Sequence, residues 1–170
     1  MLDEIDDPNS GQRVVFVRDE PDALEVNLYV RPGGYVRDHV HPSQEETFAL
    51  VAGTFVLDVG GEKRALSAGQ SETIVRQTKH GFAPAREEAQ LNVTVRPALE
   101  LGGYFRDYLT LSRDGRLRIP DSGIPRPLLL FGVLMHRYRR EIAAPGIPLW
   151  VQRPLWRVLA WLGGLFGHRL

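Results

Sequence analysis

Residues 33–46 read GGYVRDHVHPSQEE, so that His39 and His41 stand one residue apart, just before a pair of glutamates. Side chains alternate between the two faces of a β-strand, and these histidines would therefore point to the same side. A third histidine, His80, follows much later in the chain. Three imidazoles and one carboxylate, without a thiolate, suit iron, manganese, nickel, copper or zinc. The pattern predicts one divalent transition metal held inside a β-barrel.

The spacing around these residues is also informative. Gly33 precedes His39 by five intervening residues, four residues separate His41 from Glu46, and six separate Glu46 from Gly53. This stretch resembles the first motif of the cupin family, G(X)5HXH(X)3,4E(X)6G, at every fixed position.

The second cupin motif, G(X)5PXG(X)2H(X)3N, is only partly matched. Gly69 and His80 stand at the family's positions, whereas Val75, Gln77 and Pro84 replace its proline, glycine and asparagine. The candidate ligand His80 is present. The replacements affect the expected geometry of the turn before it.

The resemblance implies a jelly-roll barrel with a metal site made of His39, His41, Glu46 and His80. The family's spacing also selects between the two glutamates, because only Glu46 leaves six residues before the next motif glycine, and Glu45 would then point to solvent. A His-X-His pair by itself is more often a pair of ordinary polar residues. Some cupins also hold a metal without catalysis or bind only an organic ligand.

The periodicity of residues 13–96 independently predicts a mainly β fold. Apolar and polar residues alternate over 24–30 and 91–95, as they do in half-buried strands. Gly60-Gly61 between two further strand patterns indicates a tight hairpin. With the resemblance, the expected fold is a cupin jelly-roll β-barrel (a double-stranded β-helix) with a C-terminal α-helical extension.

Helical spacing of apolar residues replaces the strand pattern in three later stretches, 102–112, 127–142 and 154–166. We therefore predict two parts: a barrel domain over 1–112, with its core at 13–96 and a following helix, and a basic, apolar helical extension over 113–170.

Charge is unevenly distributed along the chain. Residues 126–170 contain seven arginines and one acid, Glu141, which is a formal charge of +6, and the neutral total leaves −6 for the rest. The simplest interpretation is that the extension docks on the acidic barrel of its own or a neighbouring chain. We expect its helices to pack on the barrel or across a homodimer; contact with a membrane surface is the alternative.

Composition excludes several other classes. The chain has no cysteine, which rules out disulfides and thiolate chemistry, and its zero net charge does not favour a nucleic-acid partner. Its amino terminus is acidic and lacks the apolar run of a secretory signal, so we expect a cytoplasmic protein.

The substrate is expected to be a small, partly apolar organic molecule. By strand parity, Phe48, Leu50 and Phe82 share faces with the candidate ligands and would form an apolar pocket, although ordinary barrel filling is the alternative. Arg37 shares the parity of His39 and could meet an anionic group, or be a solvated residue at the rim. The leading hypothesis is a dioxygenase-type oxidoreductase. A Lewis-acid cyclase or isomerase and a non-catalytic binding protein remain alternatives, and no further catalytic residue is predicted.

Overall fold

The computed structural model describes residues 3–82, 85–120 and 123–170. The described residues form strands β1 Glu4–Asp7, β2 Gln12–Glu20, β3 Ala23–Val30, β4 Val36–His39, β5 Glu45–Ala52, β6 Thr54–Val59, β7 Glu62–Ser67, β8 Ser71–Ile74, β9 His80–Phe82 and β10 Ala89–Arg96. Three helices follow: α1 Leu101–Arg113, α2 Leu128–Arg137 and α3 Leu149–Leu165.

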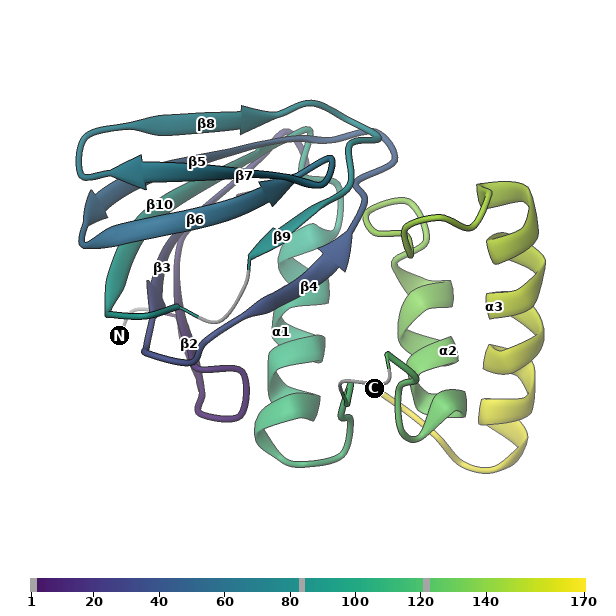
Figure 1. Ribbon diagram of the computed structural model, residues 1–170. Helices are drawn as coiled ribbons and strands as arrows, with labels where there is room; N and C mark the ends of the chain where they lie inside the picture. The colour runs from purple at the N-terminus through teal and green to yellow at the C-terminus, as the bar shows by residue number, and fades with distance from the viewer. Residues whose placement is uncertain (1–2, 83–84, 121–122) are drawn as a thin grey trace.

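The strands form two antiparallel sheets that face each other. The six-stranded sheet has the order β1-β2-β3-β10-β5-β8, and the four-stranded sheet has the order β4-β9-β6-β7. Figure 1 shows the two layers, with α1 beside the barrel and the pair α2 and α3 beyond it. The expected fold class, a jelly-roll barrel with a C-terminal helical extension, is confirmed.

The core follows from period-two burial in the central strands. In β10 the apolar residues Leu91, Val93 and Val95 are buried, whereas Asn92 between them is exposed. β10 pairs with β3 on one side and β5 on the other, so its inward face meets the inward faces of both neighbours. The alternation seen in the sequence therefore becomes the inner wall of the barrel.

Two turns, at Gly60-Gly61 and at Gln77, contain residues with left-handed backbone conformations. Gly60 and Gly61 have φ values of 65° and 94° and connect β6 to β7, which confirms the predicted hairpin. Gln77, where the cupin motif has glycine, also adopts a left-handed φ of 65°, and its backbone N–H donates to the carbonyl of His41 at 2.8 Å. The backbone conformation of a glycine is thus kept at this position without the glycine. Pro84 lies outside the described residues.

The helical boundaries differ from the sequence expectation. The prediction of a helix over 127–142 was wrong at its end, because α2 stops at Arg137 and the chain then turns so that Ala143 pairs with Val40 of the barrel. α3 begins at Leu149 rather than at Pro154, which lies in the helix interior. A proline there removes one backbone hydrogen bond.

Helices α2 and α3 form a closely packed hairpin, as Figure 1 shows. A Cβ at Gly132 would lie 2.4 Å from the Cβ of Leu159, and one at Gly163 would lie 2.8 Å from a methyl carbon of Val133. Glycine at both positions lets the two backbones approach. Among the described residues, no helix has the length and apolar character needed to cross a membrane.

One contact of the extension with the barrel domain is made by Tyr138, which is buried. Its hydroxyl donates to Asp107 Oδ2 of α1 at 2.6 Å, and its ring packs edge-on against Tyr104. Between the described residues of 126–170 and the barrel, no ion pair involves an arginine of the extension. Within the described part of one chain, ion pairs of these arginines therefore do not join the extension to the barrel.

Candidate metal centre

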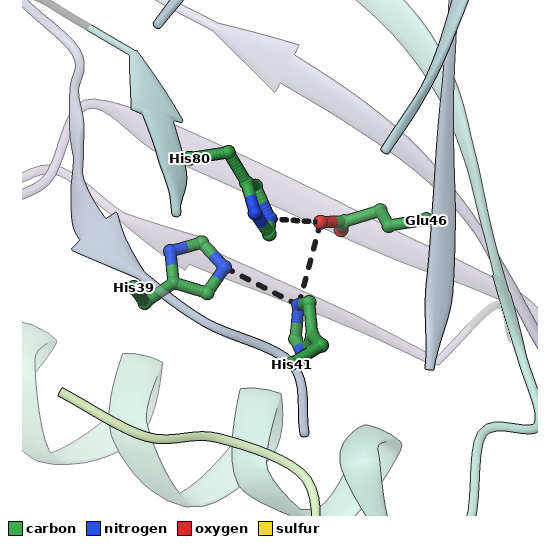
Figure 2. A group of neighbouring side chains, drawn as sticks. All are labelled: His39, His41, Glu46 and His80. Carbon is green, nitrogen blue, oxygen red and sulfur yellow. Dashed lines mark hydrogen bonds and ion pairs between the residues drawn. The ribbon is translucent and has the colours of Figure 1, made fainter. Parts of the chain in front are cut away.

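The four predicted ligands come together from three strands and the segment after β4. His39 ends β4 and stands opposite His80, the first residue of β9, in the antiparallel pair. His41 follows two residues after His39, and Glu46 is the second residue of β5 in the other sheet. Figure 2 shows the four side chains pointing toward a common centre. The site therefore depends on both sheets.

The ligand atoms are close enough to share one ion. Nε2 of His80 lies 2.7 Å from Oε2 of Glu46, Nε2 of His41 lies 3.4 Å from the same oxygen, and the Nε2 atoms of His39 and His41 are 3.3 Å apart. Two ligands about 2.1 Å from a shared ion would be about 3.0 Å apart at a right angle and about 3.4 Å apart at a tetrahedral angle. The spacings of 3.3 and 3.4 Å fit this range, whereas the 2.7 Å between His80 and Glu46 is the length of a direct hydrogen bond.

Each imidazole is held by a backbone carbonyl on the side away from the centre. The Nδ1 atoms of His39, His41 and His80 lie 3.0, 2.6 and 2.9 Å from the carbonyl oxygens of Arg37, Glu141 and Thr78, respectively. A carbonyl accepts only, so each Nδ1 carries the proton and donates it. This arrangement turns every Nε2 toward the centre, as second-shell hydrogen bonds do for metal-binding histidines.

The electrostatics of the cluster are dominated by burial and by one charged pair. Burial, with the nearby charges of His80 and His41, lowers the pKa of His39 to about 3. Burial by itself would raise the pKa of Glu46, but the neighbouring imidazoles of His41 and His80 outweigh it and hold that pKa below its usual range. Burial opposes the shift at His80 too, yet Glu46 raises its pKa. Without a cation, His80 and Glu46 therefore form a buried ion pair.

These features fit a bound cation. The Nε2 lone pairs of His39 and His41 face each other at 3.3 Å, an arrangement that is repulsive unless a proton or cation lies between them. The four donor atoms lie within 4.8 Å of one another. The cluster of His39, His41, Glu46 and His80 could thus hold a metal, and its nitrogen and oxygen donors suit a divalent transition ion without specifying which one.

The two neighbouring glutamates occupy opposite environments. Glu46 is 3% exposed and belongs to the cluster, whereas Glu45 is exposed at the start of β5. The spacing argument that separated them at the sequence level agrees with this placement.

A cavity of about 900 Å³ adjoins the cluster, and His39, Glu46 and His80 lie in its wall. Of the four predicted pocket residues, Phe48, Phe82 and Arg37 line this cavity, whereas Leu50 is buried in the barrel core and is not part of its lining. Arg37 lies over the ring of Tyr35.

The sequence prediction missed the part of the cavity wall that the helices supply. This part consists largely of apolar and aromatic side chains: Tyr104, Phe105 and Tyr108 of α1, Phe131 and Met135 of α2, Trp156 of α3, and Ile142 in the segment after α2. Helical periodicity indicated that several of these residues lie on apolar helix faces, but it did not indicate that those faces border the cavity. The helices therefore enclose space beside the candidate metal centre and do more than cover the barrel.

The carbonyl of Glu141 was also missed. It accepts the hydrogen bond from His41, and the next two residues lead into the bridge between Ala143 and Val40, whose N–H···O bonds are 3.0 and 2.9 Å long. A backbone carbonyl carries no side-chain signal. The one available hint was that Glu141 is the single acid of the arginine-rich residues 126–170, and this hint pointed to its side chain instead.

Comparison with known proteins identifies the fold. The family model described as a cupin domain matches residues 27–95, which include all four candidate ligands. No curated protein is close enough in sequence to count as a match.

Solved structures with the same fold cover the barrel part of the chain. KdgF from Halomonas sp. is 26% identical, with a TM-score of 0.51, over 56% of this chain and 86% of that one. An RmlC-like cupin from Shewanella frigidimarina is 22% identical, with a TM-score of 0.55, over 60% and 89%. Pac13 from Streptomyces, a nucleoside dehydratase, is a looser likeness: 19% identity and a TM-score of 0.47 over 56% and 76%.

Proposed function

We propose, on the premise that this chain belongs to the cupin superfamily, that it is a metal-dependent enzyme acting on a small, partly apolar organic molecule. The observation that carries the proposal is the position of the candidate metal centre in the wall of a cavity of about 900 Å³. A cavity of this size can enclose a small organic molecule, and its aromatic lining favours an apolar one.

Within this class we favour a dioxygenase-type oxidoreductase. A divalent transition metal bound by the cluster would supply Lewis acidity and, if redox-active, electron transfer to dioxygen. The protein's own residues would orient the substrate and exclude water. Phe48 and Phe82 present apolar faces beside the ligands, and a dry cavity protects reactive species from hydrolysis.

Arg37 is our candidate for fixing the substrate's orientation. It lies in the cavity wall two residues before His39, so its guanidinium could pair with a carboxylate, enolate or catecholate of the substrate. Such a pair would hold the substrate's polar end near the ligands and leave its apolar part against the aromatic wall.

The test is oxygen consumption by protein loaded with iron, manganese or nickel, with enols, catechols and flavonols as candidate substrates. We expect substrate-dependent oxygen uptake that is lost in Glu46→Gln and retained in Glu45→Gln, whose position is adjacent in sequence but exposed. Zinc-loaded protein serves as the redox-inactive control.

Two outcomes would replace this proposal. Product formation at an undiminished rate without oxygen would reject the oxygenase in favour of a Lewis-acid cyclase or isomerase, which would use the same ligands and apolar wall. Tight binding of a candidate substrate with no turnover under any metal would favour a non-catalytic binding protein.

A further inference from the structure

The outer face of α3 is apolar and has no partner among the described residues. Trp150, Val158, Trp161 and Leu165 are 78%, 54%, 66% and 66% exposed. Their spacing places them on one side of the helix, while Gln152, Trp156 and Gly163 are buried on the other side, which faces α2. The barrel and α2 therefore leave this face uncovered.

The charge around this face is positive. Arg153 and Arg157 are exposed along one flank of α3 and make no ion pair with a described residue. No aspartate or glutamate occurs after Glu141. A partner that covers the apolar face must therefore tolerate, or be attracted by, unneutralised arginines.

A second copy of the same face does not meet this condition. Two α3 helices packed face to face would bring arginine flanks together with no acid from either helix to neutralise them. A lipid surface with negatively charged headgroups meets both conditions, because its acyl region accepts apolar side chains and its headgroups attract arginine.

We propose that α3 docks the protein on an anionic membrane surface, with the helix axis in the plane of the interface. Trp150 and Trp161 are separated by about 16 Å along the helix, so two indoles would anchor its two halves at headgroup level. Exposed Phe166, just beyond the helix, would extend the apolar contact. This surface is distinct from the metal centre, and the inference does not depend on the enzyme's reaction.

The test is co-sedimentation of the full-length protein with vesicles of phosphatidylcholine alone or mixed with phosphatidylserine. We expect binding to the mixed vesicles, weakening with added salt, and a blue shift of tryptophan fluorescence. The double variant Trp150→Ser with Trp161→Ser should bind at least about tenfold more weakly. The matched control, Val17→Ser with Val75→Ser, alters exposed apolar residues of the barrel and should bind as the unaltered protein does.

A second pair of variants tests the charge. Arg153→Glu with Arg157→Glu should reduce binding to mixed vesicles by more than about tenfold. Arg76→Glu with Arg86→Glu makes the same change in net charge at exposed barrel positions and should have a much smaller effect. Thermal melts of all variants establish that each is folded before binding is compared.

Three results would overturn the proposal. One is no binding to mixed vesicles by the folded full-length protein. Another is equal binding by the tryptophan variant and its barrel control. The third is a dimer by light scattering that the tryptophan variant dissociates, without vesicle binding, which would assign the face to a second copy of the chain.

Discussion

The barrel and the C-terminal extension both border the candidate metal centre, but they contribute different chemical groups. The barrel supplies all four side chains of the cluster, three from paired strands and His41 from the segment after β4. The extension, residues 113–170, supplies the carbonyl of Glu141 and part of an apolar wall. The groups that can hold a metal thus lie in or beside strands held by several partners, whereas much of the apolar cavity wall lies on the helices.

The attachment of the two parts differs as well. The barrel is held by continuous antiparallel ladders, for example the seven residue pairs between β10 and β3. The extension reaches the barrel domain through separate contacts, among them Tyr138, the short bridge at Ala143 and the carbonyl of Glu141. We infer that the barrel sets which ions the site can bind, and that the extension can alter the site's surroundings without changing its ligands.

We expect the largest effect from a substitution at Tyr138, through which the extension contacts the barrel domain. Tyr138→Ala removes a buried aromatic ring and the hydrogen bond to Asp107, and should lower the free energy of unfolding by about 3–5 kcal/mol. It should also weaken metal binding, because the segment that holds His41 loses its anchor. Chemical denaturation and metal titration measure the two effects.

Leu91→Ala is the matched change in the barrel, at a residue that is 0% exposed and does not line the cavity. It should cost about 2–5 kcal/mol of stability and leave the affinity of the folded protein for metal nearly unchanged. Equal metal affinities in Tyr138→Ala and Leu91→Ala would refute the supporting role of the extension.

The next effect tests the barrel's contribution. Glu46→Gln removes the negative charge of the cluster and should lower metal affinity at least about 100-fold, since even second-shell changes cost up to about 100-fold. That is about 2.7 kcal/mol of binding free energy. Competition against a chromophoric chelator measures it, with Glu45→Gln as the exposed control. A similar loss in both variants would contradict the assignment of Glu46.

A smaller effect should be confined to the helical hairpin. Gly163→Ala would place a Cβ 2.8 Å from Val133 and 3.1 Å from the carbonyl oxygen of Leu129, forcing α2 and α3 apart at a cost of about 1–3 kcal/mol. Gly164→Ala has nothing within 4 Å and should instead stabilise the helix by up to about 1 kcal/mol. In Gly163→Ala, amide hydrogen exchange should become faster in α2 and α3 but not in β10. Faster exchange throughout the barrel would mean that the two parts unfold together.

The smallest effect concerns the turn before His80. Gln77→Gly removes the steric cost of a left-handed residue, about 1–2 kcal/mol, and part of this gain is offset by the larger entropy of glycine when unfolded. The net expectation is a stabilisation of at most about 1 kcal/mol, seen as a higher melting temperature. Gln77→Ala keeps the strain and should change little, so a comparable gain there would exclude strain as the cause.

The predictability of the site differs between its ligands and its surroundings. His39, His41 and Glu46 lie within eight residues, where strand parity and motif spacing decide which side chains converge. The contribution of Glu141 could not be foreseen, because it comes from a carbonyl one hundred residues away from His41. Leu50 shows the limit of parity, since a residue on the expected face can be buried in the core and still miss the cavity.

The sequence by itself determined a mainly β fold, because alternating polarity and turn residues are local properties of the chain. Its resemblance to the cupin motifs added the barrel and the four candidate ligands. Tertiary structure alone decided where α2 ends, which helix face covers the cavity and which face of α3 stays exposed. Helical periodicity states that a face is apolar but does not name its partner. For the inner face of α3 the partner is α2, reached through Gly132 and Gly163, and packing of that kind depends on atoms far apart in the sequence.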